Sequence, residues 1–155
     1  MMKSIPVLLA LLLLAACATN RISDTERLAL YQAHAGEPVQ SFRFFGRLNG
    51  WIPLGDSAVA VRTRPQEAWL LDLSRCPDLP YAHSIAVTSN MNRVQARFDS
   101  VRPLGASQTM TIPCQIRGIR PLDVSAIRDA ERDMREGGEV VDQPREEESS
   151  PDSGT

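Results

Sequence analysis

The sequence has little lysine, histidine and aromatic side chain. Of its 155 residues, one is lysine, two are histidine and 5% are aromatic. The other 16 basic residues are arginines spread along the chain, so the concentrated basic stripe that nucleic-acid binding requires is missing, and we expect no nucleic-acid partner. Eleven prolines and nine glycines exclude a coiled coil and a long repeat array, and 43% hydrophobic residues exclude a fully disordered chain.

Motifs that signal catalysis or cofactor binding are also missing. The sequence has no P-loop, no dinucleotide-binding fingerprint, no H-E-x-x-H and no C-x-x-C. The run from Gly105 to Thr109 (GASQT) fails the G-x-S-x-G pattern at its last position. The cysteines and the two histidines, His34 and His83, lack zinc-site spacing. We therefore expect no cofactor, no metal ion and no catalytic residue.

Three polar side chains are weak catalytic candidates. His83 stands beside Ser84, seven residues after Cys76, and Asp72 and Asp99 lie in expected strands. Paired-carboxylate catalysis needs two carboxyl groups that converge in space, which the sequence does not reveal. We interpret His83 as a surface or capping residue and both aspartates as members of a solvated strand face.

No apolar run reaches the roughly 20 residues that a transmembrane helix needs. Ile5–Ala16 (IPVLLALLLLAA) has 12 residues and follows Lys3, which is typical of a signal peptide. The next residues, LAAC ending at Cys17, resemble the lipobox of bacterial lipoproteins. The resemblance implies that residues 1–16 are removed between Ala16 and Cys17, and that Cys17 then carries diacylglycerol and a fatty acid such as palmitate. The alternative is an ordinary secretory signal with an incidental Cys17.

The residues after Cys17 bear on location. Three acyl chains on one residue exceed the two signals that stable membrane anchoring requires. Ala18 stands where an aspartate would favour retention at the inner membrane, so we expect an outer-membrane lipoprotein that faces the periplasm. Membrane lipid is then a partner through Cys17, and residues 17–22 are the lipidated cysteine and its tether.

Charge is distributed unevenly along the mature chain. Without residues 1–16 it has 16 arginines against 19 acidic residues, a net of −3. Residues 137–155 hold six acidic residues against Arg145, a net of −5, so the body is about +2. This stretch is rich in Glu, Ser, Pro and Gly, and we expect a disordered acidic tail. Residues 23–136 then form a single domain of ordinary size.

Two cysteines remain once Cys17 serves as the anchor. In an oxidising compartment, Cys76 and Cys114 are expected to form a disulfide. It would close a loop of about 39 residues and contribute roughly 4 kcal/mol in the chain-entropy model. A reactive thiol and a metal site are the alternatives.

Helix signals appear at both ends of the domain. Ser23 and Glu26 match the S-x-x-E capping box and predict a helix over 24–35, with Gly36 as its left-handed C-terminal residue. Asp123 is expected to cap a second helix over 124–135, whose narrow apolar stripe predicts shallow docking.

Between these helices the sequence alternates with the period of short strands. The expected strands are 40–45, 58–62, 67–73, 84–88, 93–101 and 109–119. Pro113 and Gly118 suggest an edge position or a bulge in the last one. The pattern predicts an α+β fold, in which about six antiparallel strands, flat or curled into a small barrel or roll, are flanked by an N-terminal and a C-terminal helix.

Aromatic and arginine side chains provide a candidate binding surface formed by Arg47, Trp51 and Arg62. Exposed aromatics often mark binding surfaces, although core packing is the commoner role. Four arginines could line a neighbouring face and favour an anionic envelope component; they are Arg43, Arg47, Arg62 and Arg64. Phe44 and Phe45 are adjacent, so in one strand they point to opposite faces.

Several short runs together resemble a known family. They are FFGR at 44–47, WIPLGD at 51–56, TRP at 63–65, AWLL at 68–71, CPDL at 76–79, IAVTS at 85–89, RFD at 97–99, Cys114 and IRPLD at 119–123. In these runs the chain resembles a family of small proteobacterial lipoproteins known only as a domain of unknown function. The resemblance supports the anchor, the cysteine pair and the single domain, and it implies no activity, ligand or catalytic residue.

The sequence therefore favours a non-enzymatic, lipid-anchored periplasmic module that binds or scaffolds an envelope protein or an anionic envelope component. A small envelope hydrolase or thiol enzyme with an unrecognised site is the alternative.

Overall fold

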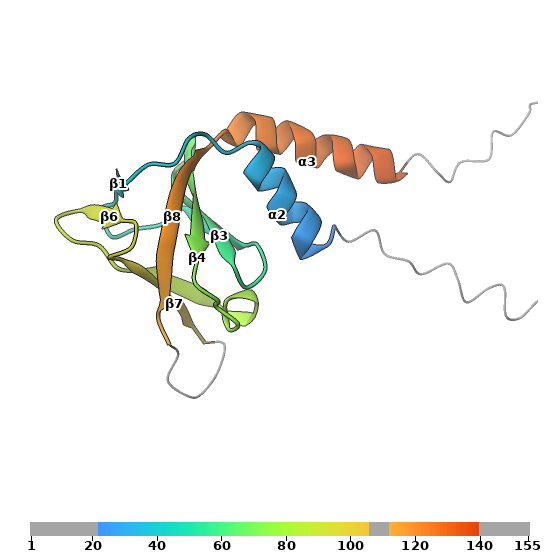
Figure 1. Ribbon diagram of the computed structural model, residues 1–155. Helices are drawn as coiled ribbons and strands as arrows, with labels where there is room; N and C mark the ends of the chain where they lie inside the picture. Colours follow the sequence, from blue (N-terminus) through green and yellow to red (C-terminus); the bar gives the residue numbers. More distant parts are fainter. Residues whose placement is uncertain (1–21, 106–111, 140–155) are drawn as a thin grey trace, which may run out of the picture.

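Six strands form an antiparallel sheet that curls into a half-barrel, and two helices flank it (Figure 1). The computed structural model describes residues 22–105 and 112–139. The strand order is β2-β3-β4-β8-β7-β5, and every neighbouring pair is antiparallel. The predicted α+β class, with a curled sheet between two helices, is confirmed.

The elements follow one another along the chain in alternating short segments. The helices are α2 (Asp24–Ala33), the 3-10 turn η2 (Leu79–Tyr81) and α3 (Val124–Glu139). The sheet strands are β2 (Gly50–Pro53), β3 (Ala58–Arg64), β4 (Glu67–Leu73), β5 (Ser84–Val87), β7 (Ser100–Leu104) and β8 (Cys114–Leu122). A separate two-stranded ribbon pairs β1 (Ser41–Arg43) with β6 (Arg93–Gln95).

Side-chain alternation along the strands divides the interior into two cores. Val59 and Val61 of β3 lie with Leu71 of β4 inside the curl, where Phe42 and Val94 of the ribbon close the open side. The intervening residues point to the other face, where the helices cover them. The second core contains Leu30, Tyr31, Leu54, Ala58, Ala60, Ala68, Leu70, Leu122, Val124 and Ile127. Figure 1 shows both helices on one side of the sheet and the ribbon on the other.

Both helices begin at the predicted caps. Ser23 Oγ accepts from the Glu26 N–H at 3.2 Å, and the Glu26 carboxylate accepts from the Ser23 N–H at 2.9 Å, which completes the capping box. Asp123 Oδ1 accepts from the Ala126 N–H at 3.0 Å. The predicted docking of α3 is also observed, because its apolar stripe is buried at Val124 and exposed at Met134. None of the described helices has the length and apolar character needed to span a bilayer.

Three backbone predictions are wrong. Residues 93–101 do not form one strand, because the chain turns between β6 and β7, with Arg97 at φ 71°. The last strand runs from Cys114 to Leu122 instead of 109–119; of the two alternatives predicted from Pro113 and Gly118, the bulge is present beside Gly118 and the strand lies inside the sheet. Gly36 is not left-handed; the N–H of Gly36 donates to the Pro121 carbonyl at 2.8 Å, and α2 ends at Ala33 with His34 as its C-cap.

Two further predictions need correction. Helix α3 continues to Glu139, beyond its predicted end at residue 135. Asp99 is buried rather than solvated: its carboxylate accepts from the Gln95 N–H at 2.7 Å and from Thr88 Oγ1 at 2.9 Å. The signal segment 1–16, Cys17 and residues 140–155 of the acidic tail lie outside the described residues.

Candidate functional site

A surface hollow of about 400 Å³ lies where β3 turns into β4. Three arginines reach it from three different segments: Arg43 at the end of β1, Arg47 in the β1–β2 connection and Arg64 at the end of β3. We call this feature the arginine hollow. Its lining residues are Arg43, Phe45, Arg47, Leu48, Asn49, Thr63, Arg64 and Glu67.

The chain between Phe44 and Arg47 shapes one wall of the hollow. Phe44 is buried in the inner core and its N–H donates to the Asn92 carbonyl at 2.9 Å, whereas Phe45 is 64% exposed. Gly46 has φ 76°, a left-handed conformation that suits glycine, and it redirects the chain after Phe45. An apolar ring therefore stands in the open beside the guanidinium groups.

Positive charge dominates the arginine hollow. Its one carboxylate, Glu67, already accepts from Thr63 Oγ1 at 2.7 Å and Trp69 Nε1 at 3.3 Å, and it pairs with Arg64 at 3.5 Å. Three guanidinium groups against one carboxylate leave the lining at about +2. Among the described residues, Arg43 and Arg47 make no ion pair.

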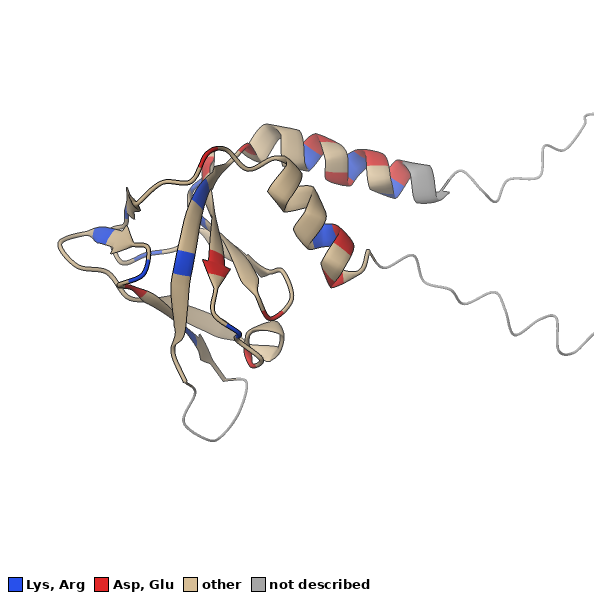
Figure 2. Ribbon diagram, viewed as in Figure 1, with Lys and Arg blue, Asp and Glu red and all other residues tan. Residues whose placement is uncertain are grey.

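The neighbouring ribbon adds to this charge. Arg43 of β1 lies directly opposite Arg93 of β6, and Figure 2 shows arginine at this end of the molecule. Like charges directly across an antiparallel pair are destabilising. By contrast, acidic and basic residues alternate along α3 (Figure 2). The ribbon therefore places positive charge where a bound anion would relieve repulsion.

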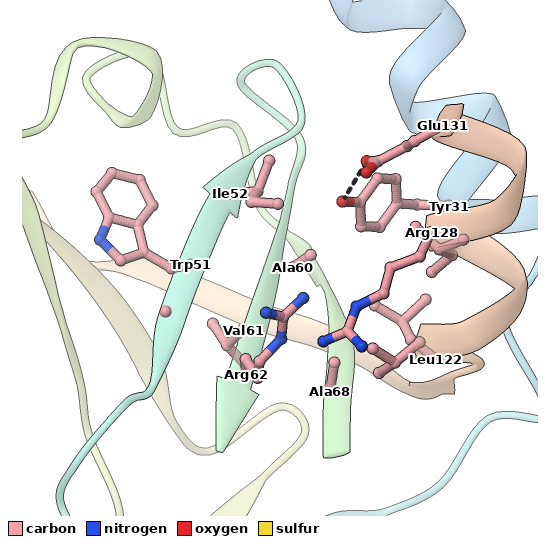
Figure 3. A pocket seen from close by; sticks show the side chains of 13 residues that line it. Tyr31, Trp51, Ile52, Ala60, Val61, Arg62, Ala68, Leu122, Arg128 and Glu131 are labelled. Carbon is pink, nitrogen blue, oxygen red and sulfur yellow. Dashed lines mark hydrogen bonds between the residues drawn. The ribbon is translucent and has the colours of Figure 1, made fainter. Parts of the chain in front are cut away.

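A second cavity, of about 170 Å³, lies between the outer face of the sheet and the helices (Figure 3). We call it the helix–sheet pocket. Six residues of the two packed layers form most of its apolar wall: Ile52, Ala60, Ala68, Leu122, Val124 and Ile127. Gly50, Trp51 and Val61 also line it. Its polar lining comes from Tyr31, Arg62, Arg128 and Glu131.

Some polar groups of the helix–sheet pocket make hydrogen bonds within the protein, and others do not. The Tyr31 hydroxyl donates to Glu131 Oε1 at 3.0 Å, and Arg128 Nη2 donates to the Pro65 carbonyl at 3.4 Å. Arg62 Nε is buried and finds no hydrogen-bond partner among the described residues. Burial, followed by the nearby charge and hydrogen bond of Glu131, raises the pKa of Tyr31 above its ordinary value. Tyr31 is therefore a neutral donor at physiological pH.

The structure places one residue of the predicted binding surface apart from the other two. Arg47 lies in the arginine hollow, whereas Trp51 and Arg62 both line the helix–sheet pocket. The Trp51 ring packs against the inner core, on the other side of β2 from Ile52 (Figure 3). Trp69 is also a packing residue, stacked on Phe42 with ring centroids 4.9 Å apart. Of the four arginines predicted to share a face, three thus lie together in the hollow (Arg43, Arg47 and Arg64), and Arg62 lies elsewhere.

The sequence did not predict that two residues, Arg128 and Glu131, line a pocket. On α3 they belong to a run of alternating charges, which reads as a solvated helix surface. The sequence does contain a weak signal, because the Val124 and Ile127 stripe places Arg128 and Glu131 at its margin. The partner residue Tyr31 lies 100 positions away, and no local pattern connects the two.

The remaining candidates, Cys76, Cys114 and His83, do not line either cavity. Cys76 and Cys114 are joined in a disulfide with Cα atoms 5.5 Å apart, so neither offers a free thiol. His83 is exposed and packs near Gly105. No group of three or more His, Cys, Asp or Glu side chains within residues 22–105 and 112–139 could hold a metal ion.

Comparison with known proteins places the chain in a family without adding an activity. No curated protein matches the sequence, and no solved structure matches the fold. Residues 1–138 match a family described as "Family of unknown function (DUF6491)". That match covers both cavities and the disulfide, so this chain belongs to the DUF6491 family of unknown function.

Proposed function

We propose that this protein is a lipid-anchored envelope module that binds a multivalent anion in the arginine hollow without catalysing a reaction. The observation that carries the proposal is the convergence of Arg43, Arg47 and Arg64 around a hollow whose one carboxylate is already bonded. Arginine presents a planar fork of donors that matches carboxylate and phosphate oxygens. A lining near +2 favours a ligand with at least two negative charges.

The exposed ring of Phe45 offers the ligand an apolar contact beside the arginines. Phe45 is 64% exposed beside Arg43 and Arg47, so an apolar or ring-shaped part of the ligand has a surface to contact. Because the guanidinium groups are open to water, their attraction for an anion is screened by salt. The proposed complex is therefore of modest affinity and sensitive to ionic strength.

The anchor rests on the residues before the fold. LAAC, ending at Cys17, provides the lipobox, and Ala18 favours the outer membrane. We propose cleavage after Ala16, acylation of Cys17 and a domain that faces the periplasm. The five residues from Ala18 to Ile22 span under about 20 Å when extended, so the domain stays close to its membrane.

The position of the tether favours an anion away from that membrane. Asp24, at the start of α2, lies against Gly55 in the β2–β3 connection, whereas the arginine hollow lies at the β3–β4 turn. Strand β3 has seven residues and separates these two ends by about 20 Å. We therefore propose a soluble or polymeric oxyanion of the periplasm rather than the headgroups of the anchoring leaflet.

The disulfide supports binding over thiol chemistry. Cys76 is fully buried and Cys114 is 5% exposed, and each supplies its sulfur to the disulfide. A thiol enzyme needs a thiolate that substrate can reach. The described part of the chain contains no other cysteine.

Calorimetric titration with inorganic tripolyphosphate tests the binding proposal on the full-length protein in an uncharged detergent. We expect saturable binding, and at least a tenfold loss in the triple variant Arg43→Gln/Arg47→Gln/Arg64→Gln. The matched control, Arg102→Gln/Arg117→Gln/Arg132→Gln, removes the same charge from other exposed positions and should bind within about twofold of the wild type. Equal weakening in both triple variants would show that binding depends only on the net charge of the protein. That result would contradict a specific site in the arginine hollow.

Two further measurements separate the sources of the anion and test the anchor. Flotation with vesicles of anionic phospholipid that depends on the three arginines, without tripolyphosphate binding, would assign the hollow to a membrane surface instead. Labelling cells with palmitate should mark the wild type and leave Cys17→Ser unlabelled. Undiminished labelling of Cys17→Ser would contradict the lipobox assignment.

A further inference from the structure

We propose that the helix–sheet pocket is a second ligand site, which takes a small carboxylate with one negative charge and an apolar part about the size of a benzene ring or a short aliphatic chain. This site lies between the sheet and α3 and does not depend on the arginine hollow. The structural basis is an apolar cavity with two guanidinium groups, one of which has a buried nitrogen without a hydrogen-bond partner among the described residues.

The size of the pocket limits the apolar part of the ligand. Its volume is about 170 Å³, and apolar cavities of about 150 Å³ are known to accept benzene. A long acyl chain exceeds this volume, so the lipid on Cys17 and phospholipid tails do not fit within it. The six apolar wall residues leave the ring or chain surrounded by carbon on the side of the sheet and at the base of α3.

The charge of the pocket selects an anion. Arg62 and Arg128 contribute two positive charges and Glu131 one negative charge, which leaves a net of +1. Figure 3 shows both guanidinium groups in the space between β3 and α3. Neither arginine makes an ion pair among the described residues. One carboxylate would neutralise the lining, whereas a phosphate ester with two charges would exceed it.

The buried Nε of Arg62 determines which functional group a ligand of this pocket needs. A buried donor without a partner costs stability, and native proteins rarely retain one without a functional or structural reason. Because Arg62 Nε is buried, a carboxylate oxygen that enters from the pocket would accept from it once the Arg62 side chain turns toward the ligand, and the second oxygen could accept from an Nη of the same fork. An alcohol or an amine of the same size cannot supply two charged acceptors.

In the free protein, the Tyr31–Glu131 hydrogen bond holds the Glu131 carboxylate away from Arg62. Glu131 Oε1 accepts from the Tyr31 hydroxyl at 3.0 Å, and Glu131 forms no ion pair with Arg62. The carboxylate nearest to Arg62 in the pocket is thus held on the side of α2. This arrangement leaves the positive end of the pocket available to a ligand.

Titration of the full-length protein with benzoate and hexanoate, followed through the methyl resonances of Ile52 and Ile127, tests the proposal. We expect saturable shifts at both methyl groups and affinity at least tenfold higher for benzoate than for benzyl alcohol, which lacks the charge. Acetate, which lacks the apolar part, should bind at least tenfold more weakly than hexanoate. Arg62→Gln and Arg128→Gln should each lose at least tenfold in benzoate affinity, and Arg132→Gln on the same helix should bind as the wild type does.

Several outcomes would overturn the pocket assignment. They are no shift at Ile52 or Ile127 with either acid, equal affinity for benzoate and benzyl alcohol, and unchanged benzoate affinity in the arginine variants. Arg128 is exposed, so Arg128→Gln keeps the test valid if Arg62→Gln fails to fold. The Arg43→Gln/Arg47→Gln/Arg64→Gln variant should retain benzoate binding, which separates this site from the arginine hollow.

Discussion

The hydroxyl of Tyr31 donates to Glu131 Oε1 at 3.0 Å and joins two helices whose residues lie 100 positions apart in the sequence. Tyr31 is 4% exposed, so the bond is sheltered from water at the edge of the helix–sheet pocket. It positions Glu131 and fixes the approach of α3 to α2. Changes at this pair should therefore affect both stability and the pocket.

Removal of the Tyr31 hydroxyl should destabilise the fold. Tyr31→Phe loses one hydrogen bond to a carboxylate, and we expect the free energy of unfolding in urea to fall by about 1 kcal/mol. Tyr81→Phe is the matched control, because the Tyr81 side chain is 73% exposed. An equal loss in the two variants would show that the Tyr31–Glu131 bond contributes nothing.

The same residue predicts a response to alkaline pH. Burial raises the pKa of Tyr31 in the folded state above its value of about 10 in the unfolded chain. The stability that follows from this shift is present below pH 10 and is lost as pH rises above it. Between pH 9 and pH 11 the wild type should therefore lose more unfolding free energy than Tyr31→Phe, and parallel losses would contradict the shift.

Asp99 should be a structural carboxylate. It is buried, and it accepts from the Gln95 N–H at 2.7 Å and from Thr88 Oγ1 at 2.9 Å, across the turn between β6 and β7. Asp99→Ala leaves both donors unpaired and should lower the unfolding free energy by about 2 to 3 kcal/mol. Asp133→Ala on the exposed face of α3 should change it by less than about 0.5 kcal/mol. A loss below 1 kcal/mol in Asp99→Ala would argue against this role.

The disulfide should supply a large share of the stability. Cys76 and Cys114 are separated by 38 positions, and a loop of this length corresponds to about 4 kcal/mol in the chain-entropy model. Cys76→Ala/Cys114→Ala should lose roughly that amount in urea unfolding, and a reductant should bring the wild type to a similar level. A reductant without effect on wild-type stability would mean that the crosslink contributes little.

Asp72 should oppose folding at neutral pH. It faces Gly118 across the bulge between β4 and β8, and burial raises the pKa of its carboxyl, against a smaller lowering by Arg120. A folded pKa above the unfolded one means that stability falls as pH rises through it. After allowance for solvent screening, Asp72→Asn should gain a few tenths of a kcal/mol at pH 7 and nothing at pH 3. A loss of stability at pH 7 would contradict this prediction.

Local chemistry accounts for the parts of the fold that the sequence predicted. The Ser23–Glu26 capping box needs only neighbouring residues, and the alternation along 67–73 sorts Trp69 and Leu71 to one face of β4. The break after β6 was missed because it depends on distant partners. The Arg97 N–H donates to the Ile116 carbonyl at 2.7 Å, and this contact forms only in the folded sheet.

The candidate sites were predicted less completely, for a related reason. Arg43, Arg47 and Arg64 could be grouped because each lies at the end of a short strand or in a turn. Arg62 belongs to the other face, since the strand period of two residues places it with Ala60 rather than with Val61. Arg64 does not follow it to that face, because the register shifts between Arg62 and Arg64. The helix–sheet pocket joins β3 to α3, and no pattern within either segment indicates that contact.

The salt dependence of tripolyphosphate binding tests the central claim most directly, because it measures whether the arginine hollow makes charge contacts with an anion. The dissociation constant should be measured by calorimetry between 25 and 200 mM salt for the wild type and for Arg43→Gln/Arg47→Gln/Arg64→Gln. We predict saturable binding of modest affinity at low salt that weakens steeply as salt rises in the wild type, with weaker binding and a nearly flat dependence in the variant. The same affinity and the same slope in both proteins would contradict the proposed function.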